Sequence, residues 1–561
     1  MSDASRDAQP AKLNDLGIDF DPDSISDPSV RRVVILLCNV IEEVALENAR
    51  LKAESQALRD EVARLKGEQG QPNVRARTRR DISSEDERKP ERRTDRPRKP
   101  RAPKMEQLTI TRTEVVPIDK SLLPEDAVHK GYETSIVQEL VISSEVIELK
   151  RETYYSPSLR KTFTAPMPGG YKGSFGPGLR SSVMLLKTVG NMTEPTITEL
   201  LNGFGVAIGK SSVDRILLKD KQAFHDEKAE IVTAGLAATS YQHIDDTSAR
   251  VKGENHHSHV ICNPYYSAFF TRQTKDRLTI LAILSGVGTP DQLPRLWNHE
   301  ARGILTGLGW ARKRLALLES LPEGKPMTKA ELDQWCAQRE LPGEPIRRLT
   351  VAMAIAAYHA RTDIPIVAIF MADDAPQFKL LAQKLALCWI HDARHYKKLR
   401  PVLPCHQRLL DDFLGQYWNF YHELRAYKDA PSAQDAERLT QRFTKLFSTT
   451  TGYGILDERI AKTKAKQAEL LLALSHPELP LHNNPAELAA RAQVRKRDVS
   501  LHTMTNEGTE VQDTCLTLRE TAKKLGVNLR DYLFDRVSKT YAMPSLADTI
   551  RERSSQATAP G

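Results

Sequence analysis

The apolar run IPIVAIFMA at 364–372 constrains the fold more than any other part of this sequence. Its apolar residues are continuous rather than alternating, which is typical of a central strand that is buried on both faces of a sheet. The run is also far shorter than the roughly 20 apolar residues that cross a bilayer, and no other stretch of the sequence approaches that length. We therefore expect an α/β protein with helices on both sides of its sheet, and no membrane segment.

The length and the cysteines narrow the class of protein further. A chain of 561 residues exceeds what one hydrophobic core organises, so we expect two to four domains. Its six cysteines are scattered, which argues against a disulfide framework and against a zinc ribbon. The polar amino terminus lacks the apolar region of a secretory signal. We expect a cytoplasmic protein.

Positive charge is concentrated in one segment. The formal net charge is +8, and residues 75–104 contain thirteen Lys or Arg against six Asp or Glu, a net +7. Few large apolar residues occur there, so we expect a disordered basic linker over 68–107. It is either a solvated spacer or an arm that neutralises DNA phosphates. The candidate DNA contacts in the linker are Arg75, Arg77, Arg79, Arg80, Arg98, Lys99 and Arg101.

A heptad pattern precedes the linker. After a polar tail over 1–29, we expect a helix over 30–67 in which leucine or valine recurs every seventh residue from Leu37 to Leu65. Such a seam needs a partner, and Asn48 at an a position favours a parallel dimer. We expect a homodimer or higher homo-oligomer through 34–65. The alternative is an amphipathic helix that packs on its own chain.

Two segments follow the linker. Residues 108–175 predict short strands, at LTITRTEVV, IVQELVI and VIELKRETYY, which end in Gly-Pro turns. Residues 176–235 predict helices with helix-turn-helix spacing: one over 195–203, a turn with glycines, and a second that begins near Ser211 as N-cap. Ser211 and Arg215 are the candidate DNA contacts of this segment.

The α/β core is expected over 236–505, with helical insertions at about 291–363 and 396–478, and a helical segment follows over 506–561. Three acids in the core are the candidates for chemistry. Asp245 follows the predicted strand YQHI, Asp373 follows the run at 364–372, and Glu487 opens a helix. Carboxyl ends of strands are where α/β proteins build sites, and three carboxylates suit two Mg²⁺ or Mn²⁺ ions that promote phosphoryl transfer.

Each acid also has a purely structural interpretation. Asp245 could end a strand at the surface, and Asp373 could cap a helix that starts at Pro376. Glu487 could complete a capping box with Asn484 as N-cap, or pair with Arg491 one turn away. A competing chemical site is the pair His391 and His395, whose spacing binds zinc in metalloproteases. Asp392 stands where those enzymes have Glu, and the sequence indicates no third ligand.

The sequence resembles the transposases of insertion-sequence family 66, which belong to the DDE group with a ribonuclease H-like core. The resemblance is carried by the blocks HIDDTSARVKGENHHSHVICNPYYSAFF, MADDAPQF, CWIHDARHYKKL and LPLHNNPAELAARAQVRKRDVSLHT, by the helical stretch that begins GSFGPGLRSS, and by the closing LRETAKKLGVNLRDYLFDRV. Family members carry a cysteine-based zinc unit after the linker, and 108–175 is a cysteine-free counterpart of it.

The resemblance implies DNA strand cleavage and strand transfer of an insertion sequence, with double-stranded DNA as element ends and target. It places Asp245, Asp373 and Glu487 at the metal positions, with two Mg²⁺ or Mn²⁺ ions. It gives Cys388, Trp389, His391, Asn483 and Asn484 supporting roles around them. It also implies a bacterial protein associated with the nucleoid and small accessory proteins of the element. The rival hypothesis is a catalytically inactive or regulatory DNA-binding relative that keeps the fold.

Overall fold

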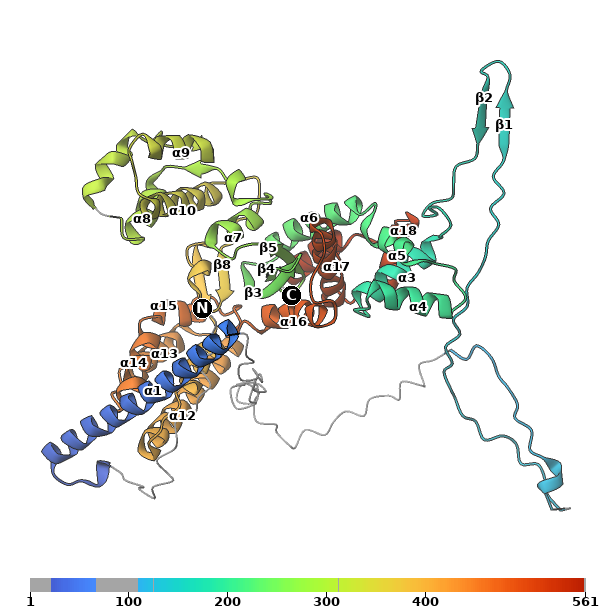
Figure 1. Ribbon diagram of the computed structural model, residues 1–561. Coiled ribbons are helices and arrows are strands. Elements are labelled where there is room, and N and C mark those ends of the chain that lie inside the picture. The colour runs from blue at the N-terminus through green and yellow to red at the C-terminus, as the bar shows by residue number, and fades with distance from the viewer. Residues whose placement is uncertain (1–21, 67–108, 125, 311, 559–561) are drawn as a thin grey trace.

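The computed structural model describes residues 22–66, 109–124, 126–310 and 312–558 (Figure 1). The predicted basic linker lies outside the described residues, together with its seven candidate contacts from Arg75 to Arg101 and most of the polar tail. Their roles stay predictions. Within the described residues, no helix is long and apolar enough to cross a membrane.

A five-stranded mixed sheet lies at the centre of the molecule (Figure 1). Its strands are β3 (Tyr241–Val251), β4 (Glu254–Cys262), β5 (Ser267–Arg272), β8 (Ile369–Ala372) and β9 (Lys384–Leu387). The strand order is β5-β4-β3-β8-β9, in which β3, β4 and β5 form an antiparallel meander and β8 and β9 run parallel to β3. The apolar run at 364–372 supplies β8, whose four residues are all buried, as predicted for a central strand. This sheet is compatible with the expected ribonuclease H-like core.

Each face of the sheet has its own helical cover. On one face Ile244, Ile261 and Phe370 belong to the largest hydrophobic core. The helices that contribute to this core beside the sheet include α6 (Gln222–Ala237), α7 (Arg277–Leu284) and α10 (Gly343–His359). On the opposite face Val260 and Phe269 pack against α16 (Asn484–Ser500) and α17 (Asn506–Lys524). Because side chains alternate along a strand, the neighbours of Ile244 and Phe370 face this opposite side of the sheet, where Ile369 and Met371 of β8 join the aromatic core of the helices that follow β9.

Two helical groups are inserted around the second half of the sheet. Between β5 and β8, the chain forms α8 (His299–Gly307) and α9 (Lys329–Ala337) beside α10, with the short strands β6 (Arg295–Leu296) and β7 (Pro326–Met327). This group has a separate core around Trp297 and Trp335. After β9 follow α11 (Trp389–Lys397), α12 (Pro404–Asp429), α13 (Ala433–Leu446), α14 (Gly454–Lys464) and α15 (Gln467–Leu470), which share an aromatic core with β8 and β9. Apart from α11, these helices lie in the stretches where the sequence predicts helices, and their role as insertions into a catalytic core stays a prediction.

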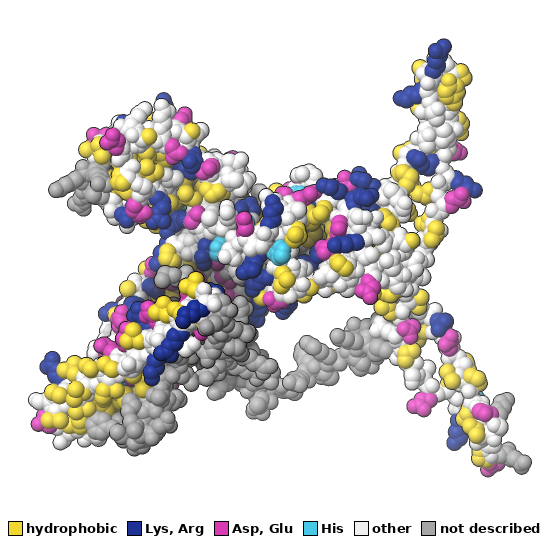
Figure 2. Space-filling model, viewed as in Figure 1, with side chains coloured by type: hydrophobic (Ala, Val, Ile, Leu, Met, Phe, Trp, Pro, Cys, Tyr) yellow, Lys and Arg dark blue, Asp and Glu magenta, His cyan; other side chains and the backbone are white. Residues whose placement is uncertain are grey.

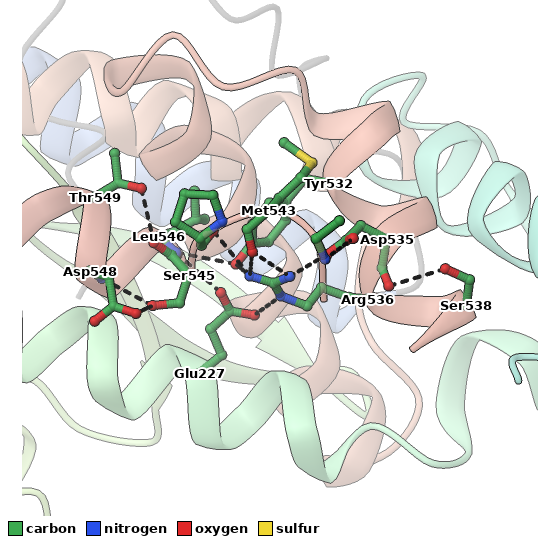
Figure 3. A network of polar contacts seen from close by, with 12 residues as sticks. Glu227, Tyr532, Asp535, Arg536, Ser538, Met543, Ser545, Leu546, Asp548 and Thr549 are labelled. Atoms are coloured by element: carbon green, nitrogen blue, oxygen red, sulfur yellow. Dashed lines mark hydrogen bonds and ion pairs between the residues drawn. The ribbon is translucent and has the colours of Figure 1, made fainter. Parts of the chain in front are cut away.

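The carboxyl-terminal helices hold α6 in place. They are α18 (Leu529–Ser538) and α19 (Leu546–Thr558). Arg536 lies at the centre of a polar network in which it contacts Glu227 of α6, Asp535, the Tyr532 hydroxyl and the carbonyl of Met543 (Figure 3). Because α6 leads directly into β3, this network fixes the approach to the strand that carries Asp245.

Helix α1 (Pro28–Leu65) begins at Asp27, whose carboxylate accepts the backbone N–H groups of Ser29 and Val30. Among its described side chains, only Cys38 and Glu42 are buried. Glu42 accepts the backbone N–H of Val402 at 2.6 Å and lies 3.1 Å from Nδ1 of His406, at the start of α12. The helix therefore packs on its own chain near its amino end.

The heptad seam of α1 is nevertheless exposed. Leu37, Val44, Leu51, Leu58 and Leu65 all stand at the surface, each at least half exposed, and in Figure 2 hydrophobic side chains gather at the end of α1 that lies away from the sheet. Cys38 and Glu42 occupy positions outside the a and d seam, so docking on the chain leaves the seam open. Self-association through 34–65 stays a prediction.

The segment before the core differs from its sequence prediction. Between 109 and 152 the described residues contain no strand, so the strands expected at LTITRTEVV and IVQELVI do not form. Only the end of the third pairs, as the hairpin of β1 (Thr153–Ser156) with β2 (Lys161–Thr164), which extends away from the body (Figure 1). Alternating apolar residues predict a strand only where a second strand can pair with it.

The predicted helix-turn-helix region forms α3 (Pro177–Thr188), α4 (Glu194–Gly203) and α5 (Lys210–Leu218). The first predicted helix agrees with α4. The second begins one residue before Ser211, and Gly209 is its N-cap, so the N-cap role expected of Ser211 is wrong. Ser211 and Arg215 are both exposed and lie one turn apart on α5, which leaves their DNA contact as a prediction.

Candidate active site

Asp245 and Asp373 lie side by side on neighbouring parallel strands. The parallel pairing of β3 with β8 ends at the pair His243 and Met371, and each aspartate stands two residues beyond it. Both side chains therefore face the α16 side of the sheet, opposite to Ile244 and Phe370. Asp245 does not end its strand as expected, because β3 continues to Val251 in its pairing with β4.

Glu487 reaches the same place from the first turn of α16. Three alanines on this helix, Ala489, Ala490 and Ala492, let it pack closely over Val260 and Phe269. The N-cap is Asn483 and not Asn484, and it makes no side-chain cap hydrogen bond, so the capping box does not form. Nor does Glu487 pair with Arg491. Its carboxylate instead accepts a hydrogen bond from Arg394 of α11, Nη2 to Oε2, at 3.0 Å.

The three acids influence one another electrostatically. Burial raises the pKa of Asp245 to about 7, and the negative charges of Asp373, Glu487 and Asp246 add to this effect. One backbone N–H, that of Asp246, donates to Asp245 Oδ1 at 2.9 Å and acts in the opposite direction. A carboxyl group in this environment ionises readily only when a cation comes near.

The aspartates that directly follow Asp245 and Asp373 differ from them in having lysine partners. Asp246 lies 3.5 Å from Lys275 Nζ and accepts a hydrogen bond from Gln377, while Asp374 pairs with Lys379 and Lys466. In the described part of the chain, neither Asp245 nor Asp373 pairs with a Lys or Arg. In each Asp-Asp pair the second residue thus has a lysine partner, and the first has no Lys or Arg partner among the described residues.

Asn483 connects the elements that carry the acids. It is buried, its Nδ2 donates to the carbonyl of Ile244 at 2.8 Å, and its Oδ1 lies 2.8 Å from Nδ1 of His243. Its backbone N–H donates to Cys388 Sγ at 3.2 Å. Because Ile244 directly precedes Asp245, the Asn483 side chain fixes the start of α16 to β3, and the Asn483 backbone fixes it to the start of α11.

Cys388, His391 and Glu487 form a second cluster beside the aspartates. The Cys388 sulfur, one ring nitrogen of His391 and one carboxylate oxygen of Glu487 all lie within 4.8 Å of one another. His391 Nδ1 and Glu487 Oε1 are 3.7 Å apart, and both are buried without a hydrogen-bond partner. Burial lowers the pKa of His391 and raises that of Cys388 to about 11, so both are uncharged at neutral pH. Trp389 is fully buried and supports the start of α11 from the aromatic core.

The three candidate acids do not form a cluster this tight among the described residues. Arg394 holds Glu487 on the side of His391, since its Nη2 donates to Glu487 Oε2 and its Nη1 donates to His391 Nε2 at 3.1 Å. Sequence reasoning missed Arg394. The available signal was its spacing, because a residue three after His391 lies on the same face of a helix.

The geometry also bears on the zinc alternative. His395 does not belong to the cluster of Cys388, His391 and Glu487. Asp392, which stands where a metalloprotease has its base, is buried and held by Arg459 at 2.5 Å and by Thr463 at 2.9 Å. The pair His391 and His395 therefore has no third ligand within the part of the chain that is described, and Asp392 serves the packing of α11 against α14.

The donor set of the acids fits a hard divalent cation. Carboxylate oxygens are the ligands that Mg²⁺ and Mn²⁺ prefer. Asp245 and Asp373 lack a cationic partner, and Glu487 has one buried oxygen, Oε1, without any hydrogen bond. A divalent ion at this edge of the sheet would be held by these three side chains and would offset both the burial and the neighbouring negative charges that raise the pKa of Asp245.

The sheet, its two helical covers and its acidic edge define a mixed α/β protein that is compatible with a ribonuclease H-like core. Comparison with known proteins agrees with the sequence resemblance. A family model described as "Transposase IS66 family" matches residues 352–511, a range that includes Asp373, Cys388 and Glu487 and begins after Asp245. The chain belongs to this transposase family.

A relative without an assigned activity also matches. The uncharacterized protein y4jO of Sinorhizobium fredii (strain NBRC 101917 / NGR234) is 32% identical over 314 residues, which cover 54% of this chain and 94% of that protein. No solved structure matches the chain.

Proposed function

We propose that the protein is a DDE-type DNA transposase that uses Mg²⁺ or Mn²⁺, in which Asp245, Asp373 and Glu487 together hold the metal. The observation that carries this proposal is the pair of uncompensated aspartates at neighbouring strand positions, with Glu487 above them on α16. Two divalent ions, when bound, activate an attacking oxygen and stabilise the leaving oxygen at a phosphorus atom. The substrates are the DNA ends of an insertion sequence and its target.

Three residues of the chain have distinct roles in preparing this site. Because its pKa is raised to about 7, Asp245 is partly protonated near neutral pH. It would lose this proton as a cation binds. Asn483 keeps Asp245 and the start of α16 in fixed positions through Ile244 and His243. His391 lies beside Glu487 as an uncharged imidazole and limits the directions in which that carboxylate can turn.

DNA would be held by surfaces outside the core. We infer that the linker arginines from Arg75 to Arg101 neutralise backbone phosphates, and that Ser211 and Arg215 on α5 contact the duplex. Self-association through the exposed seam of α1 would bring two active sites to the two ends of an element. Small accessory proteins of the element are a further proposed partner.

A strand-transfer assay tests the proposal. Full-length protein is incubated with labelled candidate element ends and Mg²⁺ or Mn²⁺, and the variants are Asp245→Asn, Asp373→Asn and Glu487→Gln. All three should lose cleavage and joining while end binding is retained. Asp246→Asn serves as the matched control, because Asp246 is already neutralised by Lys275. Normal joining by any of the three variants would contradict the assignment.

A second candidate function is a regulatory DNA-binding relative without catalysis. The ion pair between Arg394 and Glu487 favours it, because that pair keeps Glu487 out of a tight cluster with the aspartates. The same assay decides between the two. A wild-type protein that binds element ends but never cleaves them, with either metal, would support the regulatory function.

A further inference from the structure

A cavity of about 490 Å³ opens next to Asp373, on the side away from β3. Its walls come from the end of β8, from α11 and from the residues that follow α14. Five basic side chains line it: His391, Arg394, His395, Lys398 and Lys466. Its size falls within the range of about 300–1,000 Å³ that is usual for small-molecule sites, so it can hold a phosphodiester with its sugar.

The charges of this cavity do not cancel at every point. Three aspartates line the cavity, and two of them have cationic partners. Asp392 is buried against Arg459, and Asp374 pairs with both Lys379 and Lys466. Lys398 has no acidic partner among the described residues, and its side chain is exposed. The pKa of His395 is lowered to about 4, first by burial and then by the positive charges of Arg459, Lys398 and Lys466. The corner around His395 and Lys398 is therefore electropositive.

Arg394 belongs both to this cavity and to the acid site. Its Nη2 lies 3.0 Å from Glu487 Oε2, its Nη1 lies 3.1 Å from His391 Nε2, and its side chain is only partly exposed. A guanidinium group matches the oxygens of a phosphate in a two-pronged arrangement and binds phosphate as well as carboxylate. An anion in the cavity would thus compete with Glu487 for Arg394.

We propose that this cavity binds a backbone phosphate of the DNA strand beside the bond that is cut, and that Arg394 exchanges Glu487 for that phosphate. The exchange frees Glu487 to join Asp245 and Asp373. Metal binding at the acids is thereby coupled to the presence of DNA. This inference rests on the proposed transposase function, and it adds the phosphate subsite and the role of Arg394 as a positioning residue.

The first test measures phosphate binding without metal. The binding of a fluorescent DNA duplex to full-length protein is followed by anisotropy in EDTA over a range of salt concentrations. Lys398→Gln and Arg394→Gln should each weaken binding and lower the salt slope by about one released counterion. The control is Lys462→Gln on α14, where Lys462 is exposed and pairs with Glu458 outside the cavity. Variants that match this control in affinity and slope would overturn the phosphate subsite.

A competition arm separates the DNA backbone from free phosphate as the source of the anion. Inorganic phosphate is titrated into the complex of wild-type protein with duplex at constant ionic strength. If the subsite recognises a DNA strand, inorganic phosphate should compete only weakly and leave most of the duplex bound. Displacement of the duplex from wild type by low phosphate concentrations, with no displacement from Lys398→Gln, would show a free-phosphate site and would overturn the assignment to DNA.

The second test reads the release of Glu487. Mn²⁺ binding is measured by electron paramagnetic resonance on DNA-free protein, where Arg394→Gln should bind Mn²⁺ more tightly than wild type, because Glu487 no longer has to leave an ion pair before it reaches the metal. Added duplex should tighten Mn²⁺ binding to wild type and not to Arg394→Gln. Equal Mn²⁺ affinities would overturn the exchange. If no protein binds Mn²⁺ but the losses in EDTA occur, the phosphate subsite stands and the transposase chemistry fails.

Discussion

Asp245→Asn should stabilise the metal-free protein, and the gain should grow with pH. The pKa of Asp245 is raised from 3.8 to about 7, and each pKa unit corresponds to about 1.4 kcal/mol. Because the folded-state pKa is the higher one, the carboxyl group stabilises the fold fully below pH 3.8, and this stability is lost as pH rises through about 7. Relative to low pH, Asp245 therefore lowers the stability of the fold by about 2 kcal/mol at pH 5, where only the unfolded chain ionises it, and by about 4 kcal/mol at pH 8.

The assay compares wild type and variant in EDTA between pH 5 and pH 8. Amide hydrogen exchange in peptides that cover β3 reports on the core itself, since a chain of several domains need not unfold as one unit. Asparagine has the same shape and no charge, so the difference between the two proteins isolates Asp245 from every other titrating group. Asp374→Asn is the control and should show no such gain, because Asp374 pairs with Lys379 and Lys466. A difference between wild type and Asp245→Asn that does not change with pH would refute the reasoning.

Three further predictions concern the supports of the site and of α1. Asn483→Ala removes two buried hydrogen bonds and should lower Mn²⁺ affinity by about 10–100-fold, measured by titration; an unchanged affinity would show that Asn483 does not position the acids. Glu42→Ala leaves buried N–H groups at the start of α12 without an acceptor, at a cost of about 2–5 kcal/mol, so α1 should become sensitive to limited proteolysis; equal protection would contradict this docking. Leu51→Glu with Leu58→Glu should shift sedimentation toward the monomer without unfolding, because both side chains are exposed; an unchanged association state would rule out the seam.

The central part of the fold could be predicted because its signals are local. The continuous apolar run indicated a doubly buried strand, and β8 is such a strand. An acid after a buried strand also suggested where a site could lie. The continuation of β3 beyond Asp245 was not predictable in the same way, because it depends on pairing with β4, which lies in a different part of the sequence.

The contacts around Glu487 depend on residues far apart in the chain. Arg394 and Glu487 are 93 positions apart, and Asn483 reaches back by about 240 positions to β3. No periodicity or spacing signals such pairs. The same holds for α1, whose heptads indicated a seam, while its docking through Glu42 depends on backbone N–H groups at the start of α12.

The central claim is that Asp245, Asp373 and Glu487 share one metal site. Replacement of Mg²⁺ by Fe²⁺, with ascorbate and peroxide, cuts a protein backbone next to the bound ion, and the fragments are mapped by mass spectrometry on the full-length protein with bound DNA. We expect cuts near all three residues together, suppressed by excess Mg²⁺ and absent in Asp245→Asn. Cuts confined to the neighbourhood of Cys388 and His391, or cuts that persist in Asp245→Asn, would contradict this claim.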